Sequence, residues 1–229
     1  MESGEPGDGG LVYDREGIVV YHGRCEDVLP NIDAADVALV LTDPPYGIRY
    51  SPAPGGRGWA DKTFVGDDLV LGDDRDFDPA HLLRFKRLVL FGGNHYAHRL
   101  PPSPTWIVWD KRDGMPSNDF ADCELLWTNL GGPARLYRHL WNGAFRASER
   151  DQRRQHPTQK PVALMRWLVA QYTQPGDLIL DPYMGSGTTL VAAKHLGRRC
   201  IGIEIEQLYV DVAIERLFQG VLPLDGLAK

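Results

Sequence analysis

The sequence has only three cysteines in 229 residues, no long apolar run and no excess of basic charge. Cys25, Cys123 and Cys200 are far apart and form no Cys-x-x-Cys pair. This argues against a disulfide framework or a zinc site and indicates a reducing, cytoplasmic environment. No apolar stretch approaches the roughly 20 residues that a membrane-spanning helix needs, and the start, MESGEPGDGG, lacks the basic and apolar parts of a signal peptide. We therefore expect no metal and no membrane association.

Length and composition favour one domain. A chain with 43% hydrophobic residues at this length can bury one sizeable core. We expect a single domain over residues 13–219, after a disordered lead over residues 1–12 and before a tail over residues 220–229. The span 47–78 is rich in Gly, Pro and Asp without periodicity, so we expect a mobile loop there.

Apolar runs alternate with helical patterns along most of the chain, which predicts an α/β fold: a doubly wound, mainly parallel sheet with helices on both faces. Strands are predicted at 18–21, 37–41, 88–91, 106–109, 124–127, 178–180 and 200–203, and helices at 79–85, 162–172, 188–196 and 207–218.

Two predicted strands end in motifs that can bind or react. The run 37–41 leads into Asp43-Pro44-Pro45-Tyr46, and the run 178–180 leads into DPYMGSGTT from Asp181. Open α/β sheets bind their ligands at these carboxyl ends of strands. Gly185 and Gly187 allow a sharp turn and a close ligand approach, but the Lys of a nucleoside-triphosphate loop is absent. Glu204 ends the next strand, where an acid binds ribose hydroxyls, so these residues alone fit a dinucleotide equally well.

In this order, the tetrapeptide followed by the glycine motif resembles the β group of the DNA amino-methyltransferases, whose circularly permuted chains place the target-base motif before the cofactor motif. The resemblance extends from about Ile18 to about Arg216. It implies a Rossmann-like fold and S-adenosylmethionine as cofactor. The cofactor-binding positions that it implies are Asp181, Pro182, Tyr183, Gly185, Ser186, Gly187 and Thr188 in the glycine loop, Glu204 at the ribose, Thr158, Gln159 and Lys160 at the methionine carboxylate, and Cys25.

One position departs from the family pattern. Family members often have Gly-Asp-Cys where this chain has Gly23-Arg24-Cys25, and that aspartate tends to contact the adenine ring of the cofactor. Arg24 cannot replace it, because a guanidinium only donates hydrogen bonds. Either the Cys25 backbone and another acceptor such as Asp27 serve the ring, or the cofactor binds less tightly. The Cys25 side chain itself fits a buried apolar role.

The tetrapeptide supplies the catalytic residues Asp43, Pro44, Pro45 and Tyr46. An exocyclic amino group is a poor nucleophile because its lone pair is delocalised into the base. The Asp43 carboxylate and the Pro44 carbonyl can each accept one N–H, which localises that lone pair, and the two prolines preset both acceptors. Tyr46 can stack on a base flipped out of the duplex. A plain Pro-Pro turn that ends a strand is the alternative.

A second aromatic wall for the flipped base is expected from one of Trp127, Tyr137, Trp141 and Phe145, although aromatics at such spacing often fill core. The net charge of −6 is unusual for a DNA-binding protein, but basic residues crowd the short segment 131–156 while acidic residues gather elsewhere, Asp73 among them. A charge-rich segment is ordinarily solvated surface. Beside the tetrapeptide we expect it to contact double-stranded DNA, through Arg135, Arg138, Arg146, Arg150, Arg153 and Arg154.

The leading interpretation is a site-specific methyltransferase acting on the N6 amino group of adenine, since an aspartate at the first motif position is more typical of adenine-N6 enzymes. A cytosine-N4 enzyme stays open, and so does a cofactor-binding nucleic-acid module without catalysis. Enzymes with a similar tetrapeptide that modify protein glutamines or RNA usually have the opposite motif order. The stretch between Trp127 and His156 is short for reading several base edges. Three alternatives therefore stay open: the loop 47–78 shares recognition, a second subunit in a homodimer shares it, or the specificity is relaxed. The sequence does not say whether a restriction partner exists.

Overall fold

The computed structural model describes residues 8–49, 71–117, 121–142, 145–150, 156 and 158–219. The strands are β1 (Asp8–Arg15), β2 (Ile18–Gly23), β3 (Val37–Thr42), β4 (Leu88–Phe91), β5 (Trp106–Asp110), β6 (Cys123–Thr128), β7 (Arg135–Arg138), β8 (Trp141–Asn142), β9 (Phe145–Arg146), β10 (Leu178–Asp181) and β11 (Arg199–Glu204). The α-helices are α1 (Cys25–Val28), α2 (Val162–Tyr172), α3 (Thr188–His195) and α4 (Gln207–Phe218), and the 3-10 helices are η1 (Leu29–Asn31), η2 (Pro79–His81) and η3 (Ala97–Arg99).

Nine strands form one sheet in the order β1-β2-β11-β10-β3-β4-β6-β5-β7, and β8 and β9 form a separate hairpin. The strands β2, β11, β10, β3 and β4 are parallel neighbours. Strand β6 runs against both β4 and β5, and β7 is parallel to β5. Within this sheet only β1 and β6 therefore oppose the common direction, which confirms the mainly parallel sheet. Strands β3 and β10, far apart in sequence, lie side by side at its centre.

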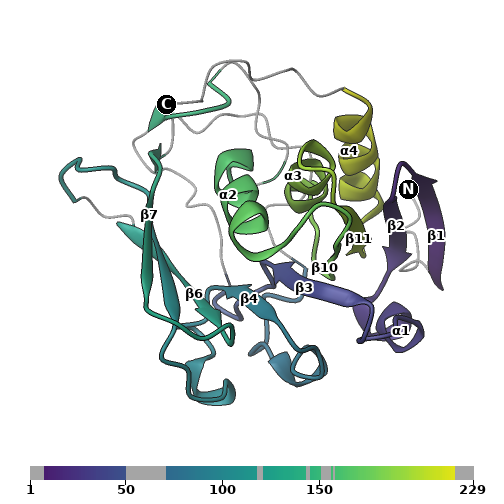
Figure 1. Cartoon of the computed structure of the whole chain (residues 1–229), viewed down its shortest axis with the longest axis horizontal. Coiled ribbons are helices and arrows are strands. Elements are labelled where there is room, and N and C mark those ends of the chain that lie inside the picture. Colours follow the sequence, from purple (N-terminus) through teal and green to yellow (C-terminus); the bar gives the residue numbers. More distant parts are fainter. Residues whose placement is uncertain are drawn as a thin grey trace.

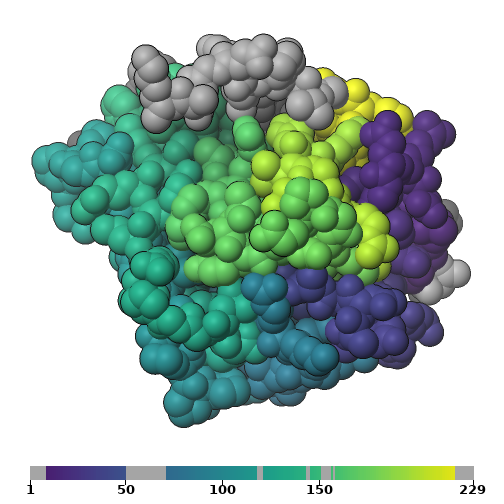
Figure 2. Space-filling view, viewed as in Figure 1, coloured from purple at the N-terminus to yellow at the C-terminus, as the bar shows by residue number. Residues whose placement is uncertain are grey.

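Helices cover both faces of the sheet. The helices α2, α3 and α4 lie along one face, and α1 lies on the other (Figure 1). Side chains on successive strand residues point to opposite faces. Accordingly, Leu39 and Leu41 pack in the cluster that includes α2, α3 and α4, whereas Val40 packs in the cluster with α1 and η1. In the space-filling view α2, α3 and α4, coloured green to yellow, form a continuous layer. It lies between the purple strands β1 and β2 on one side and the teal strands β5, β6 and β7 on the other (Figure 2).

The predicted strands and three predicted helices are confirmed, with ends that differ by at most two residues. The fourth helix, over 79–85, was wrong. Asp78 caps it by accepting the Ala80 N–H at 3.0 Å, but only the 3-10 helix η2 forms. The N–H groups of Leu82 and Phe85 bond the carbonyls of Pro79 and Leu82, three residues earlier, at 2.8 and 3.1 Å, so the segment continues as turns until β4 begins at Leu88.

The expected N-terminal lead is also shorter than residues 1–12, since Asp8 begins β1. This strand pairs with β2 through two irregularities in register, so its apolar residues do not alternate regularly. Of the expected mobile loop 47–78, residues 50–70 lie outside the described residues, as does the expected tail 220–229. No helix in the described part of the chain is long and apolar enough to cross a membrane.

Candidate active site

The two motifs meet at the carboxyl edge of the sheet, because β3 and β10 are parallel neighbours and end together. The Thr42 hydroxyl donates to Oδ1 of Asp181 at 2.7 Å, so the last residue of β3 is bonded to the last residue of β10. Burial raises the pKa of Asp181 to about 6, although hydroxyl donors oppose the shift. The expected ligand end of the sheet is therefore a single site lined by both motifs.

The glycine loop between β10 and α3 depends on residues without a side chain. Gly187 has φ 75° as the residue before α3, and a Cβ there would lie 2.7 Å from Cβ of Ala213 in α4. Gly185 has φ 49° and lies under the imidazole of His156, which would be 3.6 Å from an added Cβ. The loop thus approaches α4 at Gly187 more closely than a side chain would allow, and the positive φ values at both positions favour glycine.

Glu204, at the end of β11, connects this loop to α4. Its Oε2 accepts the Gly185 N–H at 2.9 Å, and its Oε1 accepts the N–H groups of Ile205 and Glu206 at 2.9 Å each. Burial raises the pKa of Glu204 to about 7 despite these donors. The carboxylate therefore orders the glycine loop. Its role at a ribose stays a prediction.

Hydrogen bonds and packing contacts hold the tetrapeptide Asp43-Pro44-Pro45-Tyr46 on several sides. The Tyr46 hydroxyl donates to Oδ1 of Asp43 at 2.5 Å, and Nζ of Lys160 contacts Oδ2. Burial raises the pKa of Asp43, while the charge of Lys160 lowers it. The Tyr46 ring lies against Gly92, whose added Cβ would be 2.2 Å from the ring, and it stacks on His95 with centroids 5.0 Å apart and an interplanar angle of 13°.

Asp73 lies in the acidic stretch that the sequence separates from the basic segment, and it has a structural role at the tetrapeptide. It is buried, and its Oδ1 accepts the backbone N–H groups of Tyr46, Gly47 and Ile48 at 2.9, 2.7 and 3.3 Å. The backbone after the two prolines is therefore fixed by a side chain from 25–27 residues further on. An acid in an Asp-rich stretch without periodicity gives no sequence signal for this role.

The segment before α2 joins the two halves of the site. Lys160 and Gln159 are buried, and the Gln159 carbonyl accepts the Trp141 indole N–H at 3.1 Å. The Thr158 N–H donates to Nδ1 of His156 at 3.2 Å. The His156 ring lies 4.2 Å from the Tyr209 ring, centroid to centroid, and burial lowers its pKa to about 4. His156 was not predicted, although it directly precedes the motif.

The other predicted cofactor positions have protein partners in the structure. The Ser186 carbonyl and the Thr188 hydroxyl accept from Arg216 at 2.6 and 3.1 Å. Pro182 is buried, and the Tyr183 hydroxyl bonds Nε2 of His81 at 2.9 Å.

Cys25 is buried, and this burial raises the pKa of its thiol to about 12, which suits an apolar role. Arg24 is partly exposed and lies 3.8 Å from Glu26. The contact that the family's aspartate makes is thus not replaced by the Arg24 side chain, in keeping with its donor-only chemistry.

The predicted DNA-binding arginines are only partly brought together. Arg138 pairs with Asp110 at the end of β5 and so lies at the carboxyl edge, whereas Arg135 pairs with Ile107, three residues back along the strand, about 10 Å away. Arg146 and Arg150 are joined by two hydrogen bonds, of 2.8 and 3.2 Å, between side chain and carbonyl. Arg153 and Arg154 lie outside the described residues.

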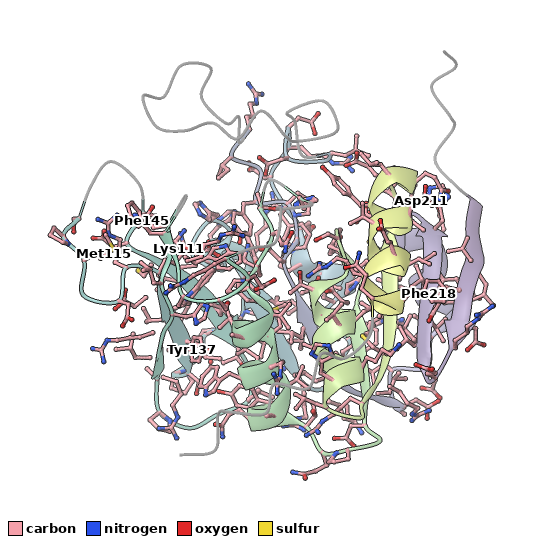
Figure 3. The ribbon with its side chains drawn as sticks, turned by 90° about the horizontal axis from the view of Figure 1, so that it is seen from above. Lys111, Met115, Tyr137, Phe145, Asp211 and Phe218 are labelled. Atoms are coloured by element: carbon pink, nitrogen blue, oxygen red, sulfur yellow. The ribbon has the colours of Figure 1, made fainter. Side chains whose placement is uncertain are left out.

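Among the four candidates for the second aromatic wall, Trp127 and Trp141 are buried, and Tyr137 stacks on Trp167 at 4.8 Å. Phe145 is 62% exposed. It lies at the same end of the molecule as Lys111 and Met115 (Figure 3). The hairpin β8–β9 that carries it is attached there by the Trp141 N–H, which donates to the Lys111 carbonyl at 2.9 Å. Phe145 is therefore the accessible candidate.

A mainly parallel sheet with an aspartate-Pro-Pro-Tyr turn and a glycine loop on neighbouring strand ends resembles the amino-methyltransferases. Comparison with known proteins agrees. Residues 132–215 match the family described as DNA methylase. The chain is 26% identical to the Type II methyltransferase M2.LlaDCHI of Lactococcus lactis subsp. cremoris, over 91% of this chain and 92% of the relative. The chain is thus similar to DNA amino-methyltransferases of the N6/N4 type.

Solved structures share the fold. The M1.HpyAVI–SAM complex superposes with a TM-score of 0.54 at 24% identity, covering 87% of this chain and 98% of that one. The PvuII DNA methyltransferase, which is cytosine-N4-specific, gives a TM-score of 0.59 at 16% identity, covering 93% of this chain and 88% of that one. At these identities the likeness shows the Rossmann-like methyltransferase fold, as predicted.

Proposed function

We propose that this protein transfers a methyl group from S-adenosylmethionine to the N6 amino group of adenine in double-stranded DNA. The observation that carries the proposal is the position of Asp43: it directly follows the end of β3, and the neighbouring strand β10, bonded to β3 through Thr42 and Asp181, leads into the glycine loop. An amino acceptor and a cofactor loop on neighbouring strand ends are the arrangement that direct transfer between two bound molecules requires.

The residues around the glycine loop fit the cofactor. Gly185 and Gly187 leave the backbone open to a close approach, and Glu204 at the end of the next strand keeps acceptor capacity beside the loop, since its Oε2 takes a single N–H from the described residues. When bound there, S-adenosylmethionine supplies an electrophilic methyl group. Asp181, held by Thr42, and Thr158 border the same space.

The chain's own part in the reaction is to prepare the amino group. Asp43 accepts one N–H of the target, and the Pro44 carbonyl accepts the other, which concentrates the lone pair on nitrogen. Both acceptors are preset, because the prolines restrict φ and Asp73 holds the next three N–H groups. Tyr46 presents its ring to a flipped base, with His95 stacked against it. Phe145 is the exposed aromatic that can close the other side.

Identifying the base that the protein methylates tests the proposal. Plasmid DNA is incubated with the purified protein and methyl-deuterated S-adenosylmethionine, digested to nucleosides and analysed by mass spectrometry. Deuterated N6-methyladenine is expected. Deuterated N4-methylcytosine would establish the cytosine alternative, and cofactor binding without any methylated base would favour a non-catalytic module. Asp43→Ala, prepared identically, controls for contaminating methyltransferases. Sequencing of the modified plasmid then gives the recognition site.

A further inference from the structure

Glu124 connects the Asp43 carboxylate, through Lys160, to the end of β5. Strand β6 is antiparallel to its neighbours, so its first residues lie at the edge where β4 and β5 end. Glu124 is the second residue of β6 and faces this edge. Its Oε1 lies 3.0 Å from Nζ of Lys111, which follows β5, and its Oε2 lies 3.4 Å from Nζ of Lys160. Lys160 in turn contacts Asp43.

The result is a chain of four alternating charges: Lys111, Glu124, Lys160 and Asp43. Its inner members are shielded, since the Lys160 side chain is 8% exposed and lies over the Phe91 ring at 5.2 Å. Buried charges at such positions need partners, because removing one partner leaves an uncompensated charge out of water. Burial by itself would lower the pKa of Lys160, but Asp43 and Glu124 raise it, so Lys160 stays protonated.

Glu124 is the second carboxylate beside Lys160, so Lys160 bridges two acids. It contacts Asp43 and lies 3.4 Å from Glu124. Lys111, 3.0 Å from Glu124, supplies a second cation, so the four-residue chain is neutral overall. Lys111 lies at the outer end, over the Trp109 ring at 5.8 Å. Each charge in the chain therefore has an opposite charge beside it, and removing Lys160 or Glu124 changes the electrostatic surroundings of Asp43.

We propose that Lys160 and Glu124 are positioning residues for Asp43: Lys160 holds the Asp43 carboxylate ionised and oriented, and Glu124 holds Lys160 in place beside it. This rests on the proposed function, because it takes Asp43 as the acceptor for the target amino group. It gives Lys160 a task at the catalytic carboxylate, besides the one at the cofactor that its motif implies.

Because Lys160 and Glu124 carry opposite charges, they must shift the pKa of Asp43 in opposite directions. Lys160 lowers the pKa of Asp43 and Glu124 raises it, against a background of burial that raises it. In Lys160→Met the acid limb of the kcat/KM profile should therefore move to higher pH, by on the order of one unit. In Glu124→Gln the limb should move to lower pH, while kcat at its plateau falls about tenfold because Lys160 loses a charged partner. Lys160→Arg, which keeps the charge, should recover most of the shift.

A second readout does not depend on turnover. Carbon-13 NMR of aspartate-labelled protein follows the Asp43 carboxyl signal directly, with Asp43→Asn identifying the signal and thermal melts confirming that each variant is folded. Opposite displacements of this titration in Lys160→Met and Glu124→Gln support the proposal. Displacements in the same direction, or none, overturn it. Failure of the wild-type protein to methylate DNA would instead count against the proposed function, and the NMR titration would still decide the charge coupling.

Discussion

Thr42 and Asp181 are 139 residues apart in sequence, yet the hydroxyl of one bonds the carboxylate of the other at 2.7 Å at the centre of the sheet. Both side chains are buried. This bond fixes the distance between the turn that carries Asp43 and the loop that carries Gly185. Together with the contact between Lys160 and Asp43, it links the predicted base-binding and cofactor-binding halves of the site.

Thr42→Val should therefore affect binding as well as stability. Loss of the donor leaves a buried carboxylate less satisfied, at a cost of about 1–3 kcal/mol in the free energy of unfolding. Because Asp181 borders the glycine loop, affinity for S-adenosylmethionine should also fall several-fold in calorimetry. Thr105→Val is the matched control: Thr105 is buried and donates to the Gly132 carbonyl at 2.6 Å, away from the site. Equal cofactor affinities in the two variants would contradict the link.

Gly187→Ala and Gly197→Ala should cause similar backbone strain but different losses in the free energy of unfolding. Gly187 and Gly197 have φ of 75° and 68°, so alanine costs about 1–2 kcal/mol at either position. At Gly187 the new Cβ also meets Ala213 at 2.7 Å, whereas at Gly197 nothing lies within 4 Å. Gly187→Ala should lose about 1–3 kcal/mol more in denaturant unfolding and weaken cofactor binding. Equal destabilisation would show that α4 yields to the extra methyl group.

The raised pKa of Glu204 predicts that the stability of the folded protein depends on pH. Its folded pKa of about 7 lies above the ordinary value of 4.5, so the folded state holds the proton more tightly than the unfolded state does. This contribution is fully present below about pH 4.5 and is lost as the pH rises through 7. The free energy of unfolding of wild type minus that of Glu204→Gln should therefore fall across this window, by up to on the order of 3 kcal/mol. Urea titrations at several pH values measure it, and a flat difference would contradict the shift.

Two arginines on β7 can distinguish DNA binding at the carboxyl edge of the sheet from DNA binding over its outer strand. Arg138 lies at the carboxyl edge and Arg135 three residues back. Arg138→Ala should weaken binding to all sequences alike and reduce the slope of log K against log salt by about 0.9, the value for one phosphate contact. Arg135→Ala should leave the slope unchanged. If the two variants exchange these effects, the DNA lies over the outer strand rather than at the active-site edge.

Much of the site could be predicted from the sequence because parallel strands end at a common edge. The apolar runs before Asp43 and Asp181 were enough to place both motifs at one edge of the sheet. Gly185 and Gly187 predicted the loop that follows β10. The contacts of Glu124 could not be predicted, since nothing in its local pattern shows that β6 runs against its neighbours. Asp73 was missed for a similar reason: its partners are backbone N–H groups, which have no residue signature. The α-helix expected over 79–85 does not form: the N–H groups of Leu82 and Phe85 bond the carbonyls three residues earlier, so this segment is a 3-10 helix followed by turns.

The most direct test of the account is a single-turnover measurement on Asp43→Ala with labelled S-adenosylmethionine and duplex DNA, together with calorimetry of cofactor binding. If Asp43 is the preset acceptor for the target amino group, the rate of methyl transfer should fall by about 10²–10³ or more, while cofactor affinity stays close to that of the wild type. Methyl transfer at near wild-type rate by a folded Asp43→Ala protein would contradict the mechanism.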